Sequence, residues 1–356
     1  MIEKQLQQVF NQFNHNADFK SYKKLASGHI NKTYFIETIK KPYYVLQCIN
    51  HNVFNDVPGL IENKIAVSQH IKKKIKQLYG KENDKEVLTF LQTKDSISYH
   101  QDPEGNYWNL MYFIDKSVTH EVVKNSKIAH EAGKLSGDFL KLTSDFDTSQ
   151  LIETIPKFHD MNYRWNQFEQ ALKTAESKRL LKSEKLNKTL EHLKAEMHII
   201  QNLKDTGKIR ERVTHNDTKI SNMLFDTKNN GICVIDTDTV MQGIIHYDFG
   251  DAIRTICNTA AEDETNLDLV EFNTTYYKAY KKGFLKYMKS SLTQLELDCL
   301  PLAAKTMMFI MALRFLTDYL NGDVYFKTNY SEHNLDRAKN QIKLLNSFTK
   351  QLSSLD

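Results

Sequence analysis

One segment constrains the fold of this chain more than any other: residues 214–222, followed by two short apolar runs and Asp236. The runs, Met223–Phe225 and Ile232–Ile235, are separated by polar residues that end in an Asn-Gly pair, which tolerates the positive φ angles of a tight hairpin turn. Antiparallel pairing across that turn places the start of the first strand beside the end of the second. The pattern therefore predicts that Asn222 and Asp236 lie next to each other.

The polar residues of this segment have the types and spacing that phosphoryl transfer requires. Asp217 follows a histidine by two positions, and Asn222 follows Asp217 by five, as in the catalytic loop of kinases. In such a loop the Asp orients the attacking hydroxyl, while the Asn and a second Asp, here Asp236, hold Mg²⁺ on the phosphates of ATP. Lys219 could reach the transferring phosphate. The alternative is that His215 and Asp217 only cap and turn the chain and that Asp236 only ends a strand. The spacing of these residues, the hairpin and Lys219 would then have to coincide by chance.

These motifs resemble the aminoglycoside phosphotransferase and choline kinase superfamily, and within it they are more similar to the N-acetylhexosamine 1-kinases. The resemblance covers nearly the whole chain and is carried by the runs His215–Lys219, Ile235–Val240 and Tyr247–Arg254. It implies an α+β, two-lobed, protein-kinase-like fold, with an antiparallel sheet and a helix in the N-lobe and a mostly helical C-lobe. It also implies Mg²⁺-dependent transfer of the ATP γ-phosphoryl group to the anomeric hydroxyl of an N-acetylhexosamine.

The order of the predicted elements agrees with the N-lobe of that fold. Three strand-like segments precede a helix that ends at Gly80, and two further strands follow it. The ranges are 22–25, 33–38 and 43–49 for the first strands, about 60–78 for the helix, and 86–91 and 107–114 for the last strands. The last strand is expected to run into a hinge that hydrogen-bonds adenine, with Met111, Phe113 and Ile114 at the nucleotide. An ordinary edge strand is the alternative.

The hinge near residue 115 is the predicted boundary between the N-lobe, 1–115, and the C-lobe, 116–356. Helical patterns in the C-lobe recur near 157–205, 265–290, 296–320 and 331–352. Asp248 and Asp251 are expected to be structural carboxylates that hold the catalytic loop and Arg254. Asp238 is expected to be solvated or to bond a loop rather than to be a third metal ligand.

The nucleotide side departs from kinase chemistry at one position. Gln47 stands on the third strand where most kinases place a lysine that pairs the phosphates with a helix glutamate. Glu62 could be that glutamate, but it lacks the lysine as a partner. Either Gln47 and the metal suffice to bind the phosphates, or the protein is a nucleotide-binding pseudokinase scaffold. We expect an active enzyme because the base, both metal ligands and Lys219 are present.

On the acceptor side, the resemblance implies that His29, Arg314 and Tyr325 contact the sugar together with Asp217. Arg314 ends an apolar run, 307–313, that is expected to be buried, so its guanidinium needs a carboxylate or a ligand that offers oxygens. The alternative partner is Asp318, one helical turn further on. For His29 the alternative is a turn histidine without a ligand.

Composition limits the remaining function classes. A chain of 356 residues, 40% hydrophobic and 26% charged, with a net charge of only +4, is typical of a globular protein and does not indicate a nucleic-acid binder. Four widely spaced cysteines indicate buried thiols in a reducing compartment. The N-terminus has no signal-peptide core and the apolar run 307–313 is too short to span a bilayer, so we expect a cytoplasmic protein without a membrane partner, as a monomer or weak dimer.

The main enzymatic rival is a kinase for a cationic acceptor such as an aminoglycoside or choline. Such a pocket should be acidic or lined by aromatic rings. The acidic run 262–264 with Asp268 is the one sequence feature that favours this rival, and a solvated loop with a helix start explains it better.

Overall fold

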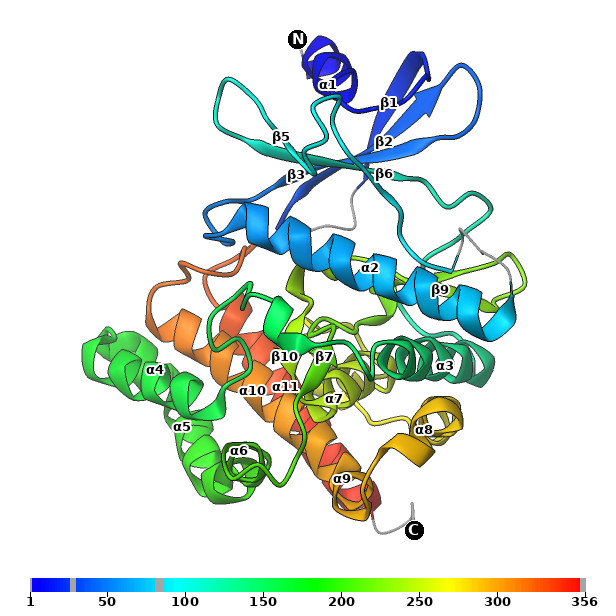
Figure 1. Ribbon diagram of the computed structural model, residues 1–356. Helices are drawn as coiled ribbons and strands as arrows, with labels where there is room; N and C mark the ends of the chain where they lie inside the picture. Colours follow the sequence, from blue (N-terminus) through cyan, green and yellow to red (C-terminus); the bar gives the residue numbers. More distant parts are fainter. Residues whose placement is uncertain (1, 26–29, 81–85, 353–356) are drawn as a thin grey trace. The chain divides into compact units, whose positions relative to one another are not determined.

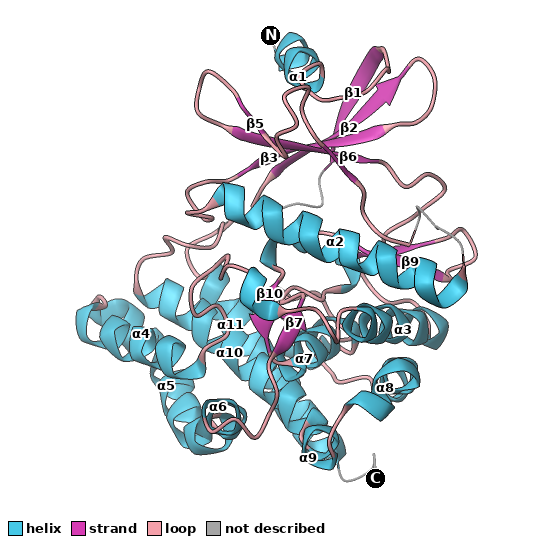
Figure 2. Ribbon diagram, viewed as in Figure 1, coloured by secondary structure: helices cyan, strands magenta, loops and turns pink. Residues whose placement is uncertain are grey.

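The computed structural model describes residues 2–25, 30–80 and 86–352. The chain divides into two compact units, each discontinuous in sequence. The first contains residues 1–119, 139–156 and 221–242, and the second contains residues 120–138, 157–220 and 243–356. The first unit carries an antiparallel sheet and the second is mostly helical, which confirms the predicted fold class (Figure 2). The predicted boundary at residue 115 stays a prediction.

The sheet of the first unit has the strand order β1-β2-β3-β6-β4, with β5 also paired to β6 (Figure 1). Its pairs are antiparallel, and Gln47 of β3 lies opposite Asn109 of β6. The strands are β1 (Phe19–Leu25), β2 (Lys32–Thr38), β3 (Tyr44–Ile49), β4 (Phe90–Leu91), β5 (His100–Gln101) and β6 (Tyr107–Tyr112). The predicted strand 86–91 is therefore reduced to two residues, and β5, equally short, was not predicted because two residues carry no periodicity.

Two helices complete the N-terminal part of this unit. Helix α1 (Ile2–Phe10) buries Leu6 and Phe10 in one apolar cluster with residues of β2, β3 and β6. Helix α2 (Val57–Tyr79) begins three residues before the predicted start, because the Asp56 carboxylate accepts the Gly59 N–H at 2.9 Å and caps it. It ends at Gly80, whose φ of 68° is the left-handed conformation that glycine adopts with less strain than other residues.

The later helices overlap the four predicted helical ranges, but helix α7 (Ile245–Ile256) lies outside all of them and helix α8 begins at Thr274 rather than near residue 265. The other strands and short helices are η1 (Thr148–Gln150), β7 (Arg212–Thr214), η2 (Ile220–Asn222), β8 (Met223–Phe225), β9 (Gly231–Val234), η3 (Thr237–Thr239), β10 (Met241–Gly243), η4 (Leu267–Leu269) and η5 (Lys289–Ser291). The α-helices are α3 (Ser126–Leu142), α4 (Met161–Thr174), α5 (Ser177–Met197), α6 (Ile199–Asp205), α7 (Ile245–Ile256), α8 (Thr274–Met288), α9 (Gln294–Asp298), α10 (Leu300–Leu320) and α11 (His333–Leu352).

Helix α10 is the centre of the second unit. Among the described residues it is the one helix long and apolar enough to cross a membrane by length and composition, and 89% of its most apolar window is buried inside the protein. The apolar run 307–313 used for the prediction is only part of this longer helix. Helix α7 crosses α10 at Gly250, where an added Cβ would lie 2.3 Å from the Ala303 carbonyl oxygen. Only glycine permits so close a contact.

Candidate active site

The predicted catalytic loop, residues 215–219, belongs to the second unit and is held by helix α7. The Asp248 carboxylate accepts the backbone N–H groups of His215 at 2.8 Å and Asn216 at 2.7 Å. Asp251, one turn further along α7, accepts the N–H of Thr218 at 3.0 Å. Asn216 has a φ of 62°, a left-handed conformation that asparagine adopts more readily than most residues with a side chain.

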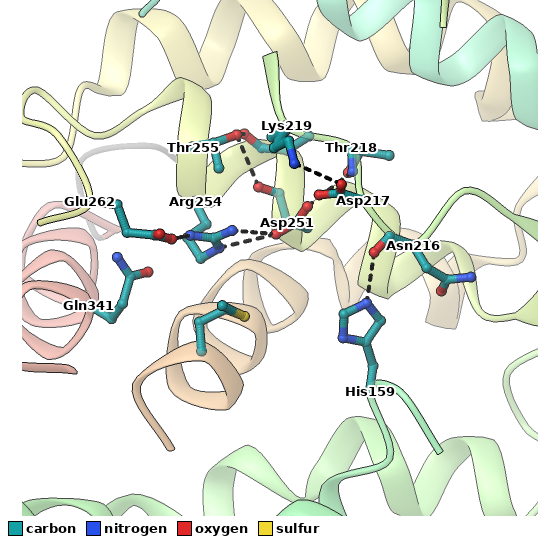
Figure 3. Close-up of polar contacts among 12 residues, drawn as sticks. His159, Asn216, Asp217, Thr218, Lys219, Asp251, Arg254, Thr255, Glu262 and Gln341 are labelled. Atoms are coloured by element: carbon teal, nitrogen blue, oxygen red, sulfur yellow. Dashed lines mark hydrogen bonds and ion pairs between the residues drawn. The ribbon is translucent and has the colours of Figure 1, made fainter. Parts of the chain in front are cut away.

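The two α7 carboxylates therefore have the structural role predicted for them. Burial raises the pKa of Asp248 to about 7, while the two donated backbone N–H groups oppose that shift. Asp251 forms an ion pair with Arg254 at 2.8 Å, and Arg254 also contacts Glu262 (Figure 3). The partner of Asp251 lies one turn along the same helix, so Asp248, Asp251 and Arg254 all belong to α7.

The predicted base and the predicted lysine lie together. Lys219 Nζ is 2.9 Å from Asp217 Oδ2, and both side chains keep about a quarter of their surface exposed, 27% and 28%. A base must reach its substrate, and this exposure leaves room for one. Figure 3 shows the pair close to Asp251.

His159 is a candidate that the sequence did not reveal. Its Nε2–H donates to the Asn216 carbonyl at 3.0 Å, which leaves Nδ1 as an acceptor with no hydrogen-bond partner among the described residues (Figure 3). Burial and the nearby Arg314 lower the pKa of His159 to about 3, so the ring is neutral. No motif marks His159, because it precedes α4 in an irregular segment and reaches the loop only through the tertiary fold.

Arg314 has aromatic neighbours instead of a carboxylate. Its guanidinium carbon lies 4.8 Å from the ring centre of Phe158, 5.5 Å from Phe326 and 5.8 Å from Tyr325. No carboxylate of the described residues forms an ion pair with it. Burial lowers the pKa of Arg314, as it does that of Arg164, which falls to about 9. Both arginines flank Phe158, since Arg164 Nη2 donates to the Phe158 carbonyl at 2.7 Å.

The alternative partner for Arg314, Asp318, is excluded by its own contacts. The Asp318 carboxylate accepts the backbone N–H groups of Val324, Tyr325 and Phe326 at 2.8–3.0 Å. It thereby shapes the segment after α10, in which Gly322 has a φ of 92°. Tyr325, on this segment, remains 54% exposed beside Arg314. The predicted contact residue His29 lies outside the described residues.

The two predicted metal ligands belong to the first unit and lie at one end of the hairpin β8–β9. Met223 pairs with Val234, and the Ile235 N–H donates to the Asn222 carbonyl at 2.8 Å, which places Asp236 next in line. The predicted hairpin is thus confirmed. An amide and a carboxylate oxygen are donors that suit Mg²⁺. No group of three or more His, Cys, Asp or Glu residues that could hold a metal occurs in the described part of the chain.

Two of the three predicted adenine contacts belong to one apolar cluster of the first unit. Met111 and Ile114 are buried in it with Leu88 and Cys233, and Val45, Leu224 and Ile235 pack around them. Phe113 is placed differently, because its N–H donates to the Tyr43 carbonyl at 2.9 Å and its ring packs against Phe35. All four cysteines are buried and free, as predicted.

Gln47 is buried in a polar network of the same unit. Its Oε1 accepts Lys64 Nζ at 2.9 Å and its Nε2 donates to Asp238 Oδ2 at 3.1 Å. Asp238 and Lys64 form a buried ion pair. Asp238 is therefore not solvated, and its contact with Asn31, in the segment before β2, agrees with the other expectation, that it bonds a loop. Glu62 is exposed, so the α2 residue in this network is a lysine and not the expected glutamate.

A model of the phosphotransferase enzyme family matches residues 21–282, well over half of the chain. The chain belongs to this family. The fold of the phosphotransferase is similar to that of an aminoglycoside phosphotransferase from Alicyclobacillus acidocaldarius, with 14% identity, a TM-score of 0.64 and coverage of 98% of this chain and 96% of that one.

Two further solved structures resemble the phosphotransferase over nearly the whole of both chains. One is a microcompartment-associated aminopropanol kinase, with 15% identity, a TM-score of 0.60 and coverage of 99% and 98%. The other is an amicoumacin kinase in complex with AMP-PNP and Ca²⁺, with 13% identity, a TM-score of 0.61 and coverage of 97% and 94%. At these identities the likeness shows the fold. The match to the family model confirms the resemblance to the aminoglycoside phosphotransferase superfamily, while the specific resemblance to the N-acetylhexosamine 1-kinases stays a prediction.

Proposed function

We propose that this phosphotransferase is a cytoplasmic kinase that transfers the γ-phosphoryl group of ATP to the anomeric hydroxyl of an N-acetylhexosamine. The observation that carries the proposal is the fixed catalytic loop, in which Asp217 lies beside Lys219 on a backbone held by two buried carboxylates. In a loose transition state, positioning of this kind supplies much of the rate.

In this proposal Asp217 accepts the proton of the anomeric hydroxyl. The hydroxyl oxygen forms a bond to the γ-phosphorus, the bond from that phosphorus to the bridging oxygen breaks, and ADP leaves. Lys219 contributes positive charge close to the base. Asn222 and Asp236 would hold Mg²⁺, whose chemistry when bound is to neutralise phosphate charge.

The charges of the acceptor side support a neutral sugar rather than a cationic acceptor. Arg314 and Arg164 flank Phe158 without a carboxylate partner among the described residues, and a cationic ligand there would meet like charge. The acidic run that favoured the rival is already engaged. Glu262 contacts Arg254, and Asp263 lies 3.2 Å from His333. The guanidinium of Arg314, which has no carboxylate partner among the described residues, would suit the hydroxyl and carbonyl oxygens of an N-acetylated sugar.

The test is an assay of ADP release with two N-acetylhexosamines, glucose, galactose, choline and kanamycin, followed by phosphorus NMR of the product. We expect the highest kcat/KM with an N-acetylhexosamine and a phosphate on C1. Faster turnover of choline or kanamycin would show that the preferred acceptor is cationic and would contradict the proposed sugar substrate. Binding of ATP without turnover of any acceptor would favour the pseudokinase scaffold.

A further inference from the structure

Three polar residues from separate segments of the first unit contact the Asp238 carboxylate, and a fourth contacts one of these three. Lys64 of α2 contacts one of its oxygens, and Gln47 of β3 and Asn31 contact the other. Asn109 of β6 donates to Gln47 Oε1 at 3.2 Å, the oxygen that also accepts Lys64. The cluster therefore joins β3, β6, α2 and the short helix η3.

The carboxamide of Gln47 is fixed by this arrangement. Its oxygen accepts two donors and its nitrogen donates to Asp238, so its polar atoms face the cluster. Gln47 is thus a positioning residue, and the expectation that it contacts phosphate directly is not supported by its contacts. The cluster holds a buried cation, since the side chain of Lys64 is only 2% exposed.

Holding an ammonium group in such a place is costly, since removing an ion from water costs several kcal/mol. In kinases the corresponding cation is a lysine on the third strand, which pairs with a helix carboxylate and contacts the nucleotide phosphates. Here the third-strand residue is neutral, the helix carries the lysine, and the carboxylate comes from Asp238, two residues after the proposed metal ligand Asp236. Lys64 has three N–H donors, of which Gln47 and Asp238 engage two.

We propose that Lys64 is the residue that supplies positive charge to the nucleotide phosphates, with Asp238 and Gln47 positioning its ammonium group. The charged pair of the kinase N-lobe is retained, but its cation has moved from the strand to helix α2. This inference rests on the proposed function, because it requires that the protein bind a nucleotide.

The experiment compares binding of adenosine and ADP by calorimetry. EDTA is present, so that a bound metal ion does not contribute to the affinity for ADP. We expect Lys64→Met to weaken ADP binding by about tenfold or more and to leave adenosine binding within about twofold. Lys73→Met, at an exposed position of the same helix, is the matched control and should behave as the wild type.

Because Lys64→Met leaves the Asp238 charge buried without its ion-pair partner, a second variant, Lys64→Met with Asp238→Asn, removes both charges and protects the fold. This double variant should also lose the preference for ADP over adenosine. If either folded variant keeps the wild-type ratio of the two affinities, Lys64 is only a structural residue and the inference is overturned. A wild-type protein that binds neither ligand would contradict the proposed function instead.

Discussion

Replacing Arg314 by methionine should impair catalysis without lowering stability. The guanidinium is partly buried and has no carboxylate partner among the described residues, so its desolvation is offset mainly by three aromatic contacts at 4.8–5.8 Å. Such contacts contribute about 0.5–2 kcal/mol each, whereas burying an ion costs several kcal/mol. Methionine is similar in length and carries no charge. The free energy of unfolding should therefore stay constant or rise by up to about 2 kcal/mol.

Catalysis should suffer in the same variant. Loss of hydrogen bonds from a charged donor to the acceptor costs about 1.5–3 kcal/mol, so kcat/KM for the sugar should fall at least about tenfold. The KM for ATP should change little. The assays are thermal or chemical denaturation and steady-state kinetics with each substrate varied in turn.

Asp318→Asn provides the contrasting control for Arg314→Met. The Asp318 carboxylate accepts three backbone N–H groups of the segment that carries Tyr325, so this variant should lose stability together with sugar affinity. If Arg314→Met is less stable than the wild type by more than about 1 kcal/mol and keeps its sugar kinetics, the reasoning fails. Arg314 would then be a structural residue, and the case for an N-acetylated substrate would weaken with it.

Three further variants test other parts of the site. Asp236→Asn should reduce kcat by orders of magnitude at every Mg²⁺ concentration, and near-normal turnover at low Mg²⁺ would refute the metal assignment. Asp248→Asn replaces one acceptor oxygen by a donor facing the N–H groups of His215 or Asn216, so it should cost about 1–3 kcal/mol of stability and lower kcat, seen by denaturation and initial rates. His159→Gln should flatten the dependence of stability on pH. The pKa of His159 is about 3 in the folded protein and about 6.5 in the unfolded chain, so His159 costs the wild type about 1.4 kcal/mol of stability for each pH unit below 6.5. Equal slopes of stability against pH for the two proteins, measured by denaturation at pH 4.5–6.5, would contradict this.

Local patterns were the most reliable guide to this structure. The hairpin that brings Asn222 and Asp236 together spans a short stretch of chain, so its pairing could be deduced from two apolar runs and a turn. Asp248 and Asp251 were correctly expected to hold the catalytic loop, because the motif places two carboxylates one turn apart.

Contacts between distant segments could not be deduced in the same way. Lys64 lies between Leu60 and Val67 on the buried stripe of α2, and a charged residue in such a stripe is a signal that the sequence did contain. Its partner Asp238 is far along the chain, and no spacing rule connects the two. His159 is a harder case, since its segment is irregular and only the folded second unit brings it to Asn216.

The close crossing of α7 and α10 at Gly250 makes the position of the catalytic loop depend on the packing of these two helices. The two carboxylates that clamp the loop lie on either side of this glycine along α7, so any side chain that separated the helices would withdraw both at once. Heating should have a similar effect if this contact loosens before the rest of the unit. The enzyme would then lose turnover below its melting temperature, and its upper working temperature would be set by one helix contact rather than by global unfolding.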